Sequence, residues 1–231
     1  MDLDWRFSKF IAFLFLTVMV FVLAFPGTSQ ADCGWAIQEY SGTKYYAWPQ
    51  DAQVKVNISP DFNEEEAESI RKAFRWWENA GGSGVRFTFI SEPKSIAGDY
   101  TIQLEKAVPS DPSWRGEVVN SPTRDHRHFA LININPNVKA RTAFLSAVSH
   151  EIGHTFGLWH CGSCPPMTTA MAIARHMNDA DTVLPYPSYC DHVAVKYSGE
   201  YTGEFTNELP EGCRPCIVSH CYWYLDWLCI R

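Results

Sequence analysis

The chain has 231 residues, of which 46% are hydrophobic, 14% aromatic and 19% charged. A charged fraction this low, with so many aromatic residues, excludes a disordered or solvating protein and predicts a compact fold. The 19 Lys and Arg residues are outnumbered by 26 Asp and Glu residues, which gives a net charge of −7. Because a protein that binds the nucleic-acid backbone needs a basic surface, we expect no nucleic-acid partner.

The N-terminal segment has the pattern of a signal peptide. An apolar run from Ile11 to Phe25 follows a short stretch that carries Arg6 and Lys9. The run is shorter than the ~20 apolar residues of a membrane-spanning helix, and small residues follow it at the spacing of a cleavage site. We therefore expect residues 1–31 to be removed, and the protein to be secreted without stable membrane insertion. Two acidic residues near the start leave an uncleaved anchor as the alternative.

All eight cysteines lie after residue 31, in the part of the chain that export brings into an oxidising compartment. An even number of cysteines there favours disulfides, and the spacing leaves their pairing open. We expect one domain over residues 32–202 and a cysteine- and aromatic-rich extension over residues 203–231. Cys213 and Cys216 are also spaced like part of a zinc knuckle, which is the alternative to disulfides in this extension.

The first predicted elements are a strand, a helix and two further strands. Alternating apolar and polar residues predict strands at 54–58, 85–90 and 100–104. Between the first two, acidic residues after Asn63 favour the start of a helix, and Gly81 ends it. The helix presents one apolar face, formed by Ile70, Ala73, Phe74 and Trp77.

The second half of the domain is predicted to contain two more strands and two helices. A short strand is expected at 117–119, at an edge of the sheet, and the apolar run 129–134 predicts a buried strand. A helix follows from about residue 140 to 156. After an irregular segment, Ser188-Tyr-Cys-Asp191 has the spacing of a capping box, which predicts a last helix over about 189–197.

The candidate site lies in the stretch His150-Glu-Ile-Gly-His154-Thr-Phe-Gly157-Leu-Trp-His160. At 3.6 residues per turn, His150 and His154 share one face of a helix, so both imidazoles are able to reach one ion. Gly157 is suited to ending the helix and turning the chain, which lets His160 return as a third ligand. Three protein nitrogens leave a fourth coordination position open, as in catalytic zinc sites.

Glu151 is rotated by ~100° from His150 around the helix, so it is aimed beside the metal rather than at it. That position suits a general base acting on water. The pattern follows an amphipathic helical run and a buried strand, which is the context that such a motif requires. We therefore expect one catalytic zinc ion, held by His150, His154 and His160, and hydrolysis of peptide bonds with Glu151 as the base.

These residues resemble the metzincin clan of zinc endopeptidases, and His-Glu-x-Gly-His-x-x-Gly-Leu-x-His is closest to its matrixin branch. The resemblance covers about residues 54–197. It implies an α+β fold of the sandwich type, with a twisted five-stranded mixed sheet, an active-site helix, and a lower subdomain with a C-terminal helix. It also implies a methionine turn that packs under the zinc without binding it. Met171 is our choice for this methionine, and Met167 is the alternative. The implied substrate is a protein or peptide in extended conformation.

The sequence departs from the matrixin pattern in two respects. Cys161 replaces the usual serine after the third histidine, and a small disulfide with Cys164 is expected there. The segment 32–53 is too short for an ordinary pro-domain. A cysteine switch at Cys33 is one alternative for this segment, and we expect a disulfide instead.

A function of another class is a secreted binding protein with a structural or vestigial metal site. Residues 203–231 would then bind a glycan or a partner protein. The intact Glu151 favours the enzyme. Cleavage of a peptide library that a chelator abolishes would distinguish the two functions.

Overall fold

The computed structural model describes residues 33–91, 100–122, 125–165, 167–173, 177 and 183–205. The predicted signal peptide, residues 1–31, lies outside the described residues, and so does the predicted extension from residue 206 onward. Among the described helices, none is long and apolar enough to cross a membrane.

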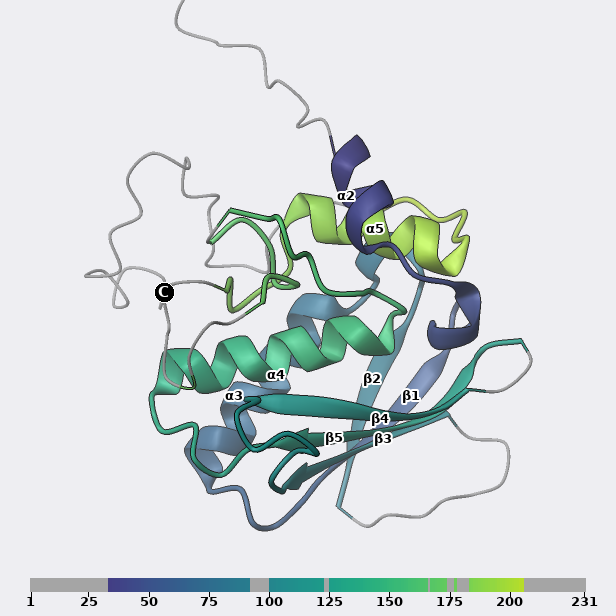
Figure 1. Ribbon diagram of the computed structural model, residues 1–231. Helices are drawn as coiled ribbons and strands as arrows, with labels where there is room; N and C mark the ends of the chain where they lie inside the picture. The colour runs from purple at the N-terminus through teal and green to yellow at the C-terminus, as the bar shows by residue number, and fades with distance from the viewer. Residues whose placement is uncertain are drawn as a thin grey trace, which may run out of the picture. The chain divides into compact units, whose positions relative to one another are not determined.

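A mixed β-sheet forms the base of the described part of the chain. Its strands are β1 (Gln53–Ile58), β2 (Arg86–Ile90), β3 (Tyr100–Lys106), β4 (Gly116–Pro122) and β5 (Arg127–Ile134). They lie in the order β2-β1-β3-β5-β4 (Figure 1). Strand β4 pairs antiparallel with β5, and the other neighbours pair in parallel. Every predicted strand is present, so the predicted five-stranded α+β fold is confirmed.

Strand β4 is longer than the sequence predicts. Only residues 117–119 alternate clearly, yet pairing with β5 runs from Gly116 opposite Ile134 to Pro122 opposite Arg127. Cross-strand hydrogen bonds therefore extend the strand beyond its local signal. As predicted, β4 lies at an edge of the sheet, where its outer backbone groups face away from β5.

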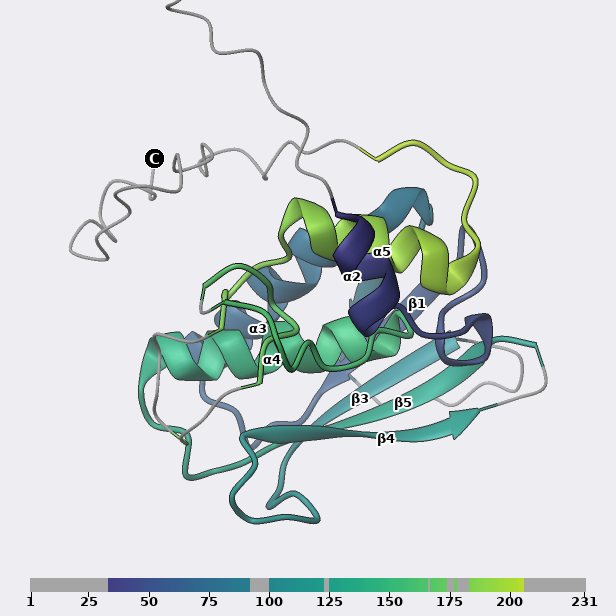
Figure 2. The same ribbon diagram turned by 45° about the horizontal axis from the view of Figure 1, so that its top comes forward.

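Two long helices, α3 (Glu64–Trp77) and α4 (Arg141–Thr155), lie on the same face of the sheet (Figures 1 and 2). The predicted apolar face of α3 is buried. Its Phe74 ring lies 4.8 Å from the ring of Phe87 in β2, and Trp77 stacks on Phe156 at 5.7 Å. These aromatic contacts form the core between the helices and the sheet, and they fix α4 over it.

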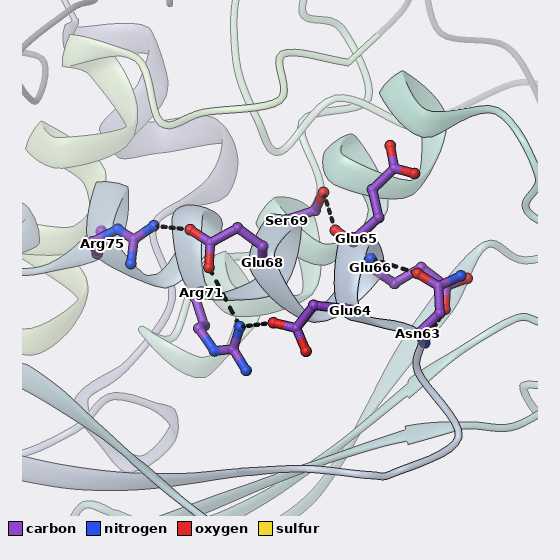
Figure 3. Close-up of polar contacts among 8 residues, drawn as sticks. All are labelled: Asn63, Glu64, Glu65, Glu66, Glu68, Ser69, Arg71 and Arg75. Carbon is purple, nitrogen blue, oxygen red and sulfur yellow. Dashed lines mark hydrogen bonds and ion pairs between the residues drawn. The ribbon is translucent and has the colours of Figure 1, made fainter.

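The N-terminus of α3 is capped as its acidic residues predict (Figure 3). The Asn63 side chain accepts a hydrogen bond from the Glu66 amide at 2.9 Å, and the Glu66 carboxylate accepts one from the Asn63 amide at 2.9 Å. On the exposed side, Arg71 contacts Glu64 and Glu68 (Figure 3). Exposed ion pairs of this kind add little stability, so α3 is held mainly by its cap and its buried face.

Two more helices lie beyond α4, on the side away from the sheet (Figure 2). They are α5 (Tyr189–Gly199), which the sequence predicts, and the short α2 (Gly34–Tyr40), which it does not. A disulfide joins Cys33 to Cys190, at the starts of these two helices. Cys33 is therefore in a disulfide, as expected, and the cysteine switch is excluded in this structure.

A second disulfide joins Cys161 to Cys164, directly after the third histidine of the motif. It confirms the small disulfide expected there. The remaining four cysteines, at 213, 216, 221 and 229, lie outside the described residues, and so do both interpretations of them, the expected disulfides and the alternative zinc knuckle.

Candidate active site

Helix α4 carries the first two histidines of the motif and the glutamate between them. The helix is buried on most of its surface, and even its serines point into the core. Ser149 accepts a hydrogen bond from the Trp77 indole at 3.0 Å, and Ser146 donates one to the Val183 carbonyl at 3.1 Å. The helix ends at Thr155, and Gly157 follows with a φ of 80°. The left-handed backbone at this glycine turns the chain back toward the helix, as predicted.

The turn brings three imidazoles together. Nε2 of His154 lies 3.1 Å from Nε2 of His150 and 3.1 Å from Nε2 of His160. Among the described residues, these three histidines are the one group of three or more His, Cys, Asp or Glu side chains placed to hold a metal ion, and their ligand atoms lie within 4.8 Å of one another. The structure thus brings together the three histidines that the sequence singles out.

Backbone carbonyl groups orient two of the rings from behind. Nδ1 of His150 donates to the Ala170 carbonyl at 2.7 Å, and Nδ1 of His154 donates to the Leu158 carbonyl at 2.8 Å. A carbonyl oxygen only accepts hydrogen bonds, so the proton of each ring resides on Nδ1. The Nε2 lone pairs are therefore directed at the space between the three rings.

The surroundings keep these imidazoles uncharged. Burial, assisted by the nearby His160, lowers the pKa of His154 to about 4. Burial also lowers the pKa of His150 well below its usual value, and it lowers the pKa of His160. Neutral imidazole is the form that binds metal ions, so the triad is ready to act as a ligand set at neutral pH.

Glu151 lies beside the triad and is 4% exposed. Burial, assisted by the charge of Glu117, raises the pKa of Glu151 to about 8. Its side chain occupies a space that exists because residue 116 is a glycine. A Cβ on Gly116 would come within 2.9 Å of both Cγ and Oε1 of Glu151. The backbone of the edge strand β4 and the side chain of Glu151 on α4 are therefore compatible only because position 116 is a glycine.

Sequence reasoning missed Gly116 and Glu117 as members of the site. Glu117 faces the same cavity as Glu151. Ser110 donates to it from its amide and hydroxyl groups, at 3.0 and 2.7 Å, and Asn133 donates from its side chain at 3.0 Å. A glycine and a glutamate at the start of a strand carry no local motif, because their role appears only when β4 lies beside α4.

The two candidate methionines have different positions. Met171 is fully buried, and a Cβ on Gly153 of α4 would approach its sulfur to 2.3 Å. Met167 is 45% exposed. Met171 therefore packs against the helix turn that separates the first two histidines. Met167 does not share this placement, and the assignment of Met171 as the methionine under the metal stays a prediction.

A buried carboxylate holds the chain around Met171. Asp191 of α5 accepts hydrogen bonds from the Thr169 hydroxyl, the Ala170 amide (3.0 Å) and the Ser188 amide (2.7 Å). The Thr169 hydroxyl in turn accepts from the Met171 amide at 2.9 Å. Because the Ala170 carbonyl orients the His150 ring, this network connects α5 with the triad.

The triad and Glu151 open into a cavity of about 560 Å³ between β4 and α4. Three exposed apolar side chains, Trp114, Trp159 and Ile173, are among the residues that line it. The cavity therefore combines polar groups at its base with apolar walls, as is usual for sites that bind organic molecules.

Neither a protein-family model nor a curated protein sequence matches the chain. Several solved structures resemble it, and they are metzincin-type zinc proteases. Archaemetzincin from Methanopyrus kandleri is 15% identical, over 63% of this chain and 94% of its own, with a TM-score of 0.42. Myroilysin is 12% identical, over 71% and 99%, with a TM-score of 0.44. High choriolytic enzyme 1, a hatching enzyme zinc-protease from the medaka Oryzias latipes, is 11% identical, over 67% and 94%, with a TM-score of 0.42.

These identities are low and the TM-scores lie below 0.5. The chemistry of this chain therefore has to be inferred from its own residues. The likeness to the matrixin branch in particular stays a prediction from the sequence motif.

Proposed function

We propose that this chain is a zinc-dependent endopeptidase. The observation that carries the proposal is the convergence of three Nε2 atoms beside the buried Glu151, at the base of an open cavity along an edge strand. A structural metal site would be closed by a fourth protein ligand. Here the fourth side of the group faces the cavity, which leaves room for water and substrate.

The donor set fits zinc. Around a tetrahedral zinc ion with Zn–N distances of ~2.0–2.1 Å, neighbouring nitrogen atoms lie ~3.3 Å apart. The two Nε2–Nε2 distances of 3.1 Å at His154 are close to that value. Two lone pairs facing each other at this distance repel unless a cation lies between them. His150, His154 and His160 would hold one zinc ion, which supplies Lewis acidity that acidifies water and polarises a carbonyl group.

In the proposed mechanism, Glu151 moves the proton. Its carboxylate removes a proton from the water that attacks the peptide carbonyl, and it then delivers this proton to the leaving amine. Burial raises the pKa of Glu151, and the positive charge of a zinc ion held by the three histidines would lower it and favour the carboxylate that accepts the proton. The two steps return Glu151 to its starting state.

Strand β4 supports an extended peptide substrate. It is an edge strand, and its residues Gly116, Glu117 and Val118 line the cavity next to Glu151. A peptide that pairs with the free side of β4 would place one carbonyl group close to the triad. Main-chain pairing makes few demands on sequence, so we expect endopeptidase activity with broad selectivity.

Two features favour action outside the cell. The disulfides Cys33–Cys190 and Cys161–Cys164 suit an oxidising compartment. Residues 1–31 have the pattern of a signal peptide that export removes.

Glu151→Gln tests the proposal. We expect the purified chain to cleave casein or a quenched peptide library, EDTA to abolish cleavage, and zinc to restore it. Glu151→Gln should bind zinc as tightly as the wild type and turn over at least ~100-fold more slowly, because only the proton carrier is lost. Glu65→Gln, an exposed glutamate on α3, is the matched control and should be fully active. Cleavage by Glu151→Gln at the wild-type rate would refute the assigned base, and peptide binding without cleavage by the wild type would favour the binding protein.

A further inference from the structure

A buried arginine connects the triad with two distant parts of the chain. Arg127, at the start of β5, is 1% exposed. Its Nε donates to the Tyr46 carbonyl at 2.7 Å, and its Nη2 donates to the His154 carbonyl at 3.2 Å. The guanidinium carbon lies 5.7 Å from the centre of the Trp48 ring, over its face. Burial lowers the pKa of Arg127 to about 10, so the group still carries its charge at neutral pH.

The contact with His154 falls at the C-terminal end of α4. Carbonyl groups in the last turn of a helix lack partners within the helix and carry partial negative charge. The His154 carbonyl accepts from the Gly157 amide at 3.1 Å as well as from Arg127. The arginine thus holds the peptide group that joins the second histidine to the turn before His160.

The other contacts of Arg127 anchor it from the opposite side. Its amide donates to the Ala47 carbonyl at 2.8 Å, next to the carbonyl of Tyr46 in η1 (Lys44–Tyr46). The Trp48 indole, which lies under the guanidinium, donates to the Thr155 hydroxyl at 3.1 Å. The guanidinium group of Arg127 therefore links the segment before β1 to the end of α4.

We propose that Arg127 is a positioning residue that sets the spacing between His154 and His160 for metal binding. This inference rests on the proposed function, since it assumes that the triad binds zinc. The planar guanidinium presents its N–H donors in fixed directions, and the two carbonyl groups that accept from it here belong to separate segments. A lysine at this position would keep the charge and lose one of the two contacts.

Zinc affinity distinguishes positioning from a merely structural role. We would measure the zinc affinity of the full chain by competition with a chromophoric chelator, and thermal unfolding in EDTA. Arg127→Met should bind zinc ~10–100-fold more weakly, the range seen when a group that orients a ligand is removed. Arg127→Lys should fall between Arg127→Met and the wild type. Tyr201→Phe, which removes a buried hydrogen bond to the Trp48 carbonyl, should lower the melting temperature and leave zinc affinity within twofold.

The outcomes separate this inference from the proposed function. If His154→Ala weakens zinc binding strongly but both Arg127 variants bind zinc like the wild type, Arg127 is only structural and the inference is wrong. If Arg127→Met does not fold, Arg127→Lys decides the question by the same criterion. If the wild type binds no zinc, or His154→Ala binds it equally well, the proposed function fails and the inference fails with it.

Discussion

The Glu151 side chain occupies the space that a side chain at Gly116 would need. A Cβ at position 116 would lie 2.9 Å from Cγ and from Oε1 of Glu151, and 3.0 Å from the Asn133 carbonyl. The two distances to Glu151 are shorter than real Cβ atoms show, and the third is tighter than most real Cβ contacts, so a side chain at this position would have to displace the glutamate or shift the sheet edge.

Gly116→Ala should therefore impair turnover while zinc binding persists. We expect kcat/KM to fall ~100-fold, since a displacement of about 1 Å at a reacting group has effects of that size. Zinc content, measured by atomic absorption, should be unchanged because the atoms nearest to the added Cβ belong to Glu151 and Asn133 and not to the three histidines. Gly162→Ala is the matched control, because a Cβ there finds its nearest neighbour 3.9 Å away. Equal activity of the two variants would show that Glu151 does not need its present position.

The stability of the metal-free protein should fall as the pH falls from about 6.5 to about 4. Burial lowers the pKa of His192 on α5 to about 4, and its ring stacks on Phe205. Below the usual histidine pKa, the unfolded chain takes up a proton that folded His192 does not accept, so protonation favours unfolding. Allowing for its partial exposure, this histidine contributes roughly 2 kcal/mol to the change.

Urea denaturation in EDTA across this pH range measures the effect. In His192→Asn the amide oxygen replaces Nδ1 as the acceptor for the Gly81 amide. The slope of unfolding free energy against pH should become shallower in this variant than in the wild type. An unaltered slope in His192→Asn would mean that this residue is not buried in its neutral form.

The two disulfides should differ greatly in their contribution to stability. Cys33–Cys190 spans 157 residues and Cys161–Cys164 spans 3. Because a cross-link restricts the unfolded chain more when the loop is longer, the upper limits are about 5 and about 2 kcal/mol. We expect Cys33→Ser with Cys190→Ser to lower the melting temperature far more than Cys161→Ser with Cys164→Ser. The reverse order in calorimetry would contradict the loop-length explanation.

Asp191→Asn should destabilise the segment around Met171. The carboxylate accepts from three donors, at Thr169, Ala170 and Ser188, and an amide would point an NH₂ group at one of them. A buried donor without an acceptor costs about 1–3 kcal/mol, measurable by chemical denaturation. Asp61→Asn, at an exposed carboxylate that accepts from Ser59, is the control and should change stability by less than ~0.5 kcal/mol.

The sequence predicts those features of the structure that depend on residues close together in the chain. The capping residues Asn63 and Ser188, the apolar face of α3, and the return of the chain at Gly157 all depend on neighbours within a few positions. The spacing of His150, His154 and His160 belongs to the same kind of signal, because the pitch of one helix and one turn bring the rings together. Their role as metal ligands stays a prediction that zinc analysis will test.

The remaining parts of the site depend on contacts between segments far apart in the chain. The need for a glycine at position 116 arises from the nearby side chain of Glu151, and the role of Arg127 arises from its hydrogen bond to the end of α4. The short helix α2 has a weak local pattern and is held by the Cys33–Cys190 bond and by the hydrogen bond from the Trp159 amide to the Tyr40 carbonyl. Secondary-structure propensity and hydrophobic periodicity do not predict such contacts, because each is calculated over a single short segment of the chain.

The carbonyl groups behind His150 and His154 have a consequence for how an ion would enter the site. Since each ring is already oriented by a hydrogen bond to its Nδ1, little conformational freedom remains to be lost when a dication arrives. The metal ion would then bind to a preformed site, whereas in a zinc finger the binding of the metal drives folding. The apoprotein should keep its native backbone, and the ion should be exchangeable without unfolding.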